Sequence, residues 1–354
     1  MLLERRIPDV VCTDELPVRL AAEIDFLAGR TGRWCDLSDQ HPPALSARAL
    51  ALAGRHLEAS TALGRVDVES SALVDIAAAA WAASRVGGPT VPLLLARLDR
   101  GGPEFVEDQF PAGPRRLYTG VLHAAQGELP TAIAELTAAA AVGDARAPLW
   151  GALCRLELGR VLRTVEALPV ADAAPSAPVL AAARTYFLAG GYRSLAARVE
   201  AASSSTTAVI DQGRPGSIGF GVQPASGIRS TKGLLALAHL VENEHRVVSA
   251  AELAMVVDGG DPASVAALTA EALASRATDD EVRQSGEYID SIRAVLFDDT
   301  TRSRMTKLLR RTIANLSQVH QLAARHLDAS VVTGYGCRYR PRGAPVTWRI
   351  GSPR

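Results

Sequence analysis

Residues 300 to 316 of the chain read TTRSRMTKLLRRTIANL, a stretch without proline or glycine. Its apolar residues recur at helical spacing, which predicts an amphipathic helix with a stripe formed by Met305, Leu308, Leu309, Ile313 and Leu316. Between 301 and 316 the stretch has no acid and five cations, which are Arg302, Arg304, Lys307, Arg310 and Arg311. A solvated helix normally interleaves acids with its cations, because opposite charges four residues apart support it. The one-signed face therefore favours a polyanionic partner, with a plain solvated face as the alternative.

The positive charge of the chain gathers at its C-terminal end. From Thr301 to Arg354 there are eleven Lys or Arg and one acid, Asp328, a net of ten positive charges. The whole chain has a formal net charge of zero, so the first 300 residues carry ten excess negative charges. This asymmetry indicates that the C-terminal region has a function that depends on its charge.

A β-hairpin is expected after the basic helix and a connector. Residues 329 to 340 read ASVVTGYGCRYR, two short β-branched or aromatic runs around a Gly-Tyr-Gly turn. Arg338, Arg340 and Arg342 accompany the second run. The terminal run 346–350, VTWRI, alternates as a strand does, and we expect it to join the hairpin or a strand at 217–222 in a small sheet.

The basic helix followed by TGYGCRYRP resembles the end of the winged-helix domain of OmpR/PhoB-type response regulators. That domain typically ends in a recognition helix rich in Arg and Leu and a hairpin of the form VRGVGYRL. Residues 231–244 resemble its first helix, and 245–249, HRVVS, resemble its connector GRVVS with His in place of Gly. Residues 250–253, AAEL, are similar to the RExL opening of its second helix, without the Arg.

The resemblance covers roughly residues 217 to 350. The tail 327–334 also looks like the C-terminal module of actinobacterial regulators that carry helical repeats. The main departure is an insert at about 262–298, which we expect to form two helices, 262–275 and 279–296. The insert either covers its own domain or forms a dimer contact.

The resemblance implies a DNA-binding role for particular side chains. The helix 300–316 would enter the major groove, where Arg304, Lys307 and Arg311 would face the bases. Arg302 and Arg310 would contact phosphates, which position a protein without reading sequence. The hairpin would touch the adjacent backbone or the minor groove through Tyr335, Arg338 and Arg340.

The first 202 residues predict helix after helix. We expect helices at 16–28, 44–63, 70–85, 91–98, within 115–139 as a helix–turn–helix, at 145–165 and at 175–201. The run AxGxxxxAxxxL from Ala125 to Leu136 resembles a tetratricopeptide unit. Because no clean period of about 34 residues is present, degenerate repeats and a plain helical bundle both remain open.

Chemistry-bearing motifs are scarce. The Cys residues at 12, 35, 154 and 337 have neither CxxC nor metal-ligand spacing, and the His residues are scattered. The chain has no Walker phosphate loop and no HExxH motif, so we expect neither an enzyme nor a cofactor nor a metal site. It also lacks an apolar signal peptide core or a run long enough to cross a bilayer, and we expect a cytoplasmic protein without a membrane partner.

The expected fold class is mainly α, with an antiparallel, tetratricopeptide-like helical-repeat domain followed by a winged helix-turn-helix α+β domain with a helical-hairpin insert. The expected domains are a helical domain at 1–202, a polar linker at 203–216 and a winged helix at 217–354. The expected function is sequence-specific binding of double-stranded DNA by a transcriptional regulator with a sensor or protein-interaction domain. The alternatives are a protein-interaction adaptor that uses the winged helix for docking, and a helical domain that binds a small metabolite and gates DNA binding. A homodimer stays open.

Overall fold

The computed structural model is mainly helical and contains three small sheets among its described residues. It describes residues 18–30, 32–35, 41–107, 111–170, 173–213, 215–229, 231–274, 298–334 and 336–351. The chain divides into two compact units. The helical unit comprises Met1–Glu166, Val170–Thr206 and Phe220–Ala225, and the mixed unit comprises Ala167–Pro169, Thr207–Gly219 and Ser226–Arg354.

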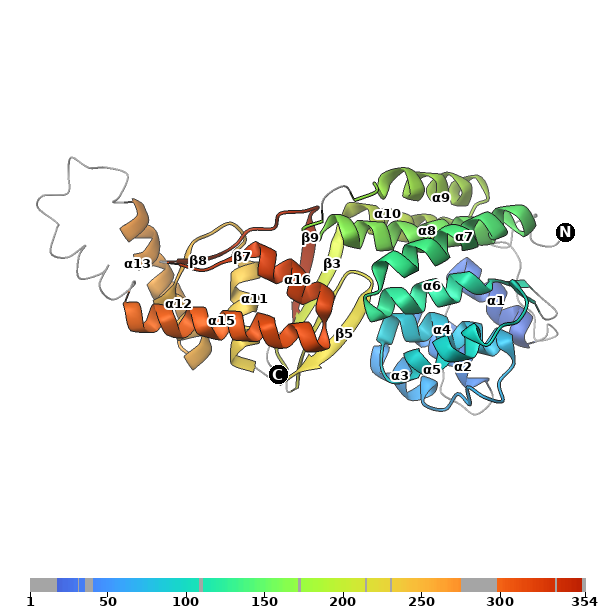
Figure 1. Ribbon diagram of the computed structural model, residues 1–354, viewed down its shortest axis with the longest axis horizontal. Helices are drawn as coiled ribbons and strands as arrows, with labels where there is room; N and C mark the ends of the chain where they lie inside the picture. The colour runs from blue at the N-terminus through green and yellow to red at the C-terminus, as the bar shows by residue number, and fades with distance from the viewer. Residues whose placement is uncertain are drawn as a thin grey trace, which may run out of the picture. The chain divides into compact units, whose positions relative to one another are not determined.

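The helical unit is built mainly from α-helices (Figure 1), and its described residues also include one small β-hairpin. Its elements are α1 (Val18–Ala28), the 3-10 turn η3 (Gly32–Trp34), α2 (Pro43–Leu52), α3 (His56–Leu63), α4 (Leu73–Val86), α5 (Thr90–Asp99), β1 (Phe105–Glu107), β2 (Pro111–Pro114), α6 (Arg115–Gln126), α7 (Leu129–Arg146), α8 (Pro148–Glu166), α9 (Ala177–Ala189) and α10 (Arg193–Ser204). The expected helix at 44–63 is two helices, because Gly54 takes a positive φ of 76° between them. The expected helix at 175–201 is likewise divided, at Gly191 with φ 77°. The β1–β2 hairpin is absent from the sequence prediction.

Helices α6, α7 and α8 pack in succession. Gly127 ends α6 in the left-handed conformation, with φ 84°, which turns the chain directly into α7. A Cβ on Gly120 would lie 2.7 Å from Leu136 Cγ, and a Cβ on Gly143 would lie 2.5 Å from the Gly151 nitrogen. Glycine at these positions therefore lets neighbouring helices approach more closely than any other residue would. The expected helix–turn–helix at 115–139 is confirmed.

In its described residues the mixed unit combines helices with two sheets. Its helices are α11 (Thr231–Glu242), α12 (Ala250–Asp258), α13 (Pro262–Ala274), α15 (Asp299–Val319) and α16 (Gln321–Ser330). Strands β3 (Thr206–Asp211), β4 (Gly216–Phe220), β5 (Gln223–Ile228) and β9 (Val346–Gly351) form a sheet of order β5-β4-β3-β9. Strands β6 (Val248–Ser249), β7 (Val331–Val332) and β8 (Gly336–Tyr339) form a sheet of order β6-β8-β7.

Two predictions about strands are confirmed. Strand β7 pairs with β8 antiparallel, with Val331 opposite Tyr339, which is the expected hairpin. The terminal strand β9 joins the sheet that contains β4, with β3 as its direct neighbour. The hairpin pairs instead with β6, where Val248 lies opposite Cys337.

The structure differs from the expected linker at 203–216. Residues 206–211, TTAVID, form strand β3, and their side chains alternate between buried and more exposed positions. The β-branched residues and the alternation suit a half-buried strand, and this signal is masked by the Ser and Thr residues that precede it. In the insert, the first expected helix is α13, and the second, 279–296, lies outside the described residues.

In the part of the chain that the structure describes, no helix combines the length and the apolar character needed to span a membrane.

Candidate nucleic-acid interface

Helix α15 is the basic helix predicted from the sequence, and its apolar face is buried. Met305, Leu309, Ile313 and Leu316 are buried, together with Thr312, whereas Leu308 is only partly covered. The helix packs against α11 and α12. A Cβ on Gly233 of α11 would lie 1.9 Å from Thr312 Oγ1, so α11 and α15 meet closely at this glycine. The packing therefore fixes which face of α15 is exposed.

The start of α15 is capped by an acid. The Asp298 carboxylate accepts a hydrogen bond from the Thr301 backbone nitrogen at 2.7 Å. This backbone hydrogen bond lowers the pKa of the Asp298 carboxyl. The negative charge also suits the positive end of the helix dipole. The basic helix thus begins at a defined side-chain cap.

The first two cations of α15 have carboxylate partners. Arg302 lies 2.9 Å from Asp299, and the exposed Arg304 lies 3.0 Å from Asp258 at the end of α12. Lys232 of α11 shares the same carboxylate at 3.3 Å. Hydrogen bonds from Arg304 and Lys232 lower the pKa of Asp258. These ion pairs give Arg304 a role in holding α15 to α12, beside the base contact predicted for it.

The later cations of α15 are exposed and lack such partners. Lys307, Arg310 and Arg311 are exposed, and no described carboxylate lies within ion-pair distance of any of them. In the hairpin, Arg338 is partly exposed and Arg340 is exposed, also without a described carboxylate partner. Tyr335 lies outside the described residues. The structure thus divides the predicted contact residues into a paired group and an unpaired group.

A groove of about 790 Å³ runs between α15, α16 and strand β7. Its described lining includes three arginines from three separate segments, Arg310, Arg325 and Arg342, and one acid, Asp328. All four side chains are exposed. Arg325 was missed by the sequence analysis, which treated residues 317–328 as a connector. The available signal was the helical spacing of Leu322, Ala323 and Leu327, which are buried in α16.

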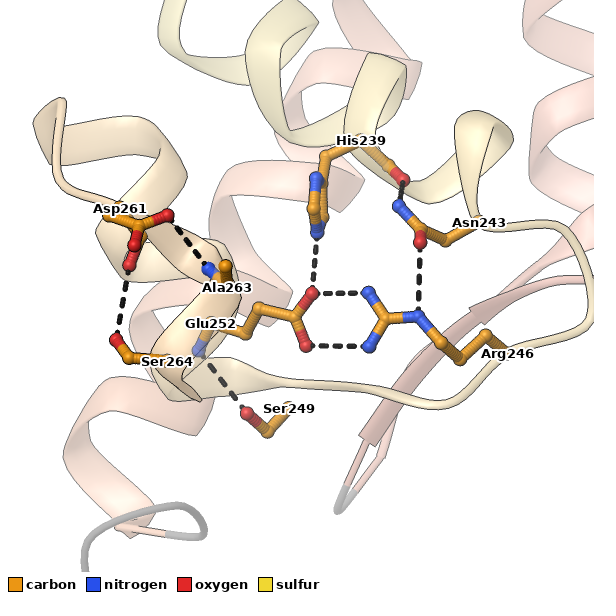
Figure 2. A network of polar contacts seen from close by, with 8 residues as sticks. All are labelled: His239, Asn243, Arg246, Ser249, Glu252, Asp261, Ala263 and Ser264. Atoms are coloured by element: carbon orange, nitrogen blue, oxygen red, sulfur yellow. Dashed lines mark hydrogen bonds and ion pairs between the residues drawn. The ribbon is translucent and has the colours of Figure 1, made fainter. Parts of the chain in front are cut away.

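A buried carboxylate joins α11, the connector before α12 and α12 itself (Figure 2). Glu252 of α12 is fully buried, and its carboxylate meets His239 Nε2 of α11 at 2.6 Å and both terminal nitrogens of Arg246. Asn243 holds the Arg246 guanidinium from the other side, accepting from Nε at 3.0 Å. Ser249 caps α12 by accepting from the Glu252 nitrogen at 3.2 Å.

The electrostatics of this network favour an ionised Glu252. Burial by itself raises the pKa of the carboxyl, but the hydrogen bonds from His239 and Arg246 outweigh it, so the pKa of Glu252 lies below its usual value. The network joins α11, the connector and α12, and α15 packs against both of these helices. Arg246, Ser249 and Glu252 belong to the two short motifs, HRVVS and AAEL, that carried the family resemblance.

A second polar network anchors the hairpin. The Tyr339 hydroxyl is 2.9 Å from His326 Nε2 of α16 and accepts a hydrogen bond from Trp348 Nε1 of β9 at 2.9 Å. His326 Nδ1 lies 2.8 Å from the Ala167 carbonyl oxygen, which can only accept, so Nδ1 carries the proton and Nε2 accepts from Tyr339. Burial lowers the pKa of His326, which favours this neutral tautomer. The hairpin is thereby tied to α16 and to β9.

The described residues contain no group of three or more His, Cys, Asp or Glu placed to hold a metal ion. Cys35, Cys154 and Cys337 are free thiols, and burial raises the pKa of Cys337 to about 11. No protein-family model, curated protein or solved structure matches the chain.

Proposed function

We propose that the protein is a transcriptional regulator that binds double-stranded DNA sequence-specifically through α15 and the β7–β8 hairpin. The observation that carries this proposal is the exposed row Lys307, Arg310 and Arg311, left without described carboxylate partners on a helix whose other face is buried. Unneutralised cations on a rigid helix suit a polyanion, and arginine can pair bidentately with guanine in the major groove.

The order of elements supports a winged-helix interpretation of the mixed unit. Three strands precede α11, a short strand precedes α12, and the basic helix α15 is followed by a hairpin. Strand β8 lies between β6 and β7, so the hairpin is joined by pairing to the connector before α12. The chain departs from the resemblance at α13 and at α16, which separates the basic helix from the hairpin.

For the helical unit, we propose a sensor or protein-interaction role built on tetratricopeptide-like helix pairs. The successive packing of α6, α7 and α8, with glycines at their close approaches, supports this role. Stacked helix pairs of this kind present extended surfaces to a peptide or small molecule.

The test is selection of genomic duplex DNA by the full-length chain at two salt concentrations, followed by sequencing. We expect a defined motif to be enriched at the higher salt, because base contacts persist while phosphate contacts weaken with counterion release. Binding that disappears with salt and enriches no motif would leave only a basic surface. A protein-interaction adaptor would then be the better interpretation.

A further inference from the structure

We propose that the groove between α15, α16 and β7 holds the sugar–phosphate backbone of the bound nucleic acid through Arg310, Arg325 and Arg342. This inference rests on the proposed DNA-binding function and deepens it. It assigns a backbone cleft beside the helix that reads bases. It also assigns a contact role to α16, a helix to which the sequence resemblance gives no part.

The chemistry of the groove matches a phosphodiester chain. Ser317, Gln321 and Thr333 line it together with the three arginines. Hydroxyl, amide and guanidinium groups are the side chains that most often contact DNA phosphates and sugars. Leu309 and Ile313 are buried in the core of the unit, whereas Val332 of the lining is exposed, so the groove offers apolar surface beside its polar and cationic groups.

The charge of the groove is uncompensated within the described structure. Three guanidinium groups face one carboxylate, Asp328, and none of the four groups has a described partner within ion-pair distance. Like charges gathered around a groove repel one another, and a polyanion would relieve this repulsion. The same unit pairs Arg304 and Lys232 with Asp258, so the absence of partners at the groove is a local property of that surface.

Backbone binding and base reading predict different behaviour. A phosphate contact carries no sequence information, so its loss should weaken binding to every duplex by a similar factor and should reduce the salt dependence. A base contact should lose affinity mainly for the selected motif. Arg325 is the best residue to test, since α16 places it in the groove and no base contact is assigned to it.

The experiment measures duplex affinity of the full chain for its selected motif and for unrelated DNA over a series of salt concentrations. Arg325→Gln should weaken both several-fold and lower the slope of log affinity against log salt by about one. Arg325→Lys should keep most of the wild-type affinity, because lysine also binds phosphate, as a point charge. Arg349→Gln is the matched control, because Arg349 is an exposed arginine of the mixed unit that does not line the groove.

A second variant should raise the affinity for DNA, a result that misfolding could not produce. Asp328→Asn removes the acid found among the described lining residues and should strengthen binding to both duplexes several-fold. Glu242→Gln is its control, because Glu242 is an exposed acid of α11 outside the groove.

The outcomes separate the two proposals. If the wild type selects a motif but Arg325→Gln and Asp328→Asn behave like their controls, the groove proposal is overturned and DNA binding stands. If the wild type binds no duplex, both are overturned. If an acidic peptide binds in place of DNA and Arg325→Gln abolishes that binding, the groove serves a protein partner and the backbone proposal is overturned.

Discussion

The arginines of the helical unit and those at the basic end of the mixed unit differ in burial and in ion pairing. In the helical unit, the buried Arg48 lies 2.7 Å from the buried Glu23, and Glu157 meets Arg85 at 2.7 Å and Arg160 at 2.8 Å. In the mixed unit, Lys307, Arg310, Arg311 and Arg325 are exposed without a described carboxylate partner. The contrast teaches that the first set of charges holds helices together, whereas the second set has no described carboxylate to neutralise it.

The largest effect should come from removing a buried acid of the helical unit. Glu157 is 2% exposed and forms ion pairs with Arg85, Arg160 and, at 3.6 Å, Arg198. Glu157→Gln would leave three guanidinium groups gathered without their counter-charge, and we expect a loss of about 3–5 kcal/mol in the free energy of unfolding. Chemical denaturation measures it.

The control for Glu157→Gln is Glu58→Gln, because Glu58 forms an ion pair with Arg55 in which both side chains are substantially exposed. Its loss should leave the free energy of unfolding close to that of the wild type, because solvent screens exposed ion pairs. Equal effects of the two variants would contradict the idea that the helical unit depends on buried charge pairs.

Much of the local structure follows from the sequence, because the signal there is periodic. The stripe from Met305 to Leu316 predicts both α15 and its buried face, and the Gly-Tyr-Gly turn predicts the β7–β8 hairpin. Strand β3 was assigned to a linker, because its alternation is only six residues long and follows a run of Ser and Thr. Short elements next to polar runs leave too little periodicity to identify.

The candidate site could be predicted from the sequence only in part. The sequence names the cations of α15, but the ion pair between Arg304 and Asp258 joins residues 46 positions apart and has no periodic signature. The same holds for His239 and Glu252, and for the groove, which requires α15, α16 and residues around β7 to meet. Tertiary packing therefore decides which of these cations have a carboxylate partner.

The second prediction separates the paired from the unpaired cations on α15 itself. Arg311→Ala should cost about 1–3 kcal/mol of DNA-binding free energy and relax the sequence preference. Arg304→Ala should cost less, because its guanidinium is already bound to Asp258. Duplex titrations with the selected motif and with single-base variants measure both, and Arg349→Ala is the control for loss of one exposed positive charge.

If Arg304→Ala relaxed the preference more than Arg311→Ala, the ion pair with Asp258 would have to open on binding, and the division of α15 into two groups would be wrong. If Arg311→Ala weakened every sequence equally, Arg311 would be a phosphate contact.

A smaller effect is expected from pH, which changes the stability of the folded mixed unit through the ionisation of Glu252. Its folded pKa lies below the usual value, so the ionised carboxylate stabilises the folded unit above the unfolded pKa, which is about 4.3. This stability is lost as the pH falls through the folded pKa. We expect hydrogen-exchange protection factors in α11 and α12 to fall toward acid pH, and Glu252→Gln to lower them at neutral pH and flatten that dependence. Unchanged protection at neutral pH in this variant would contradict the role of the network.

The smallest effect should come from an exposed pair of the helical unit. Arg184 and Glu200 lie 2.9 Å apart, with side chains 50% and 57% exposed. Glu200→Gln should change the free energy of unfolding by less than about 1 kcal/mol, because solvent screens such pairs. The variant nevertheless creates an unpaired, exposed arginine in the helical unit. We expect its duplex affinity and salt slope to equal those of the wild type, since one free charge outside the α15–α16 surface adds no contact to the backbone. A rise equal to that of Asp328→Asn would mean that net charge alone governs binding, and the distinction between the two units would lose its functional meaning.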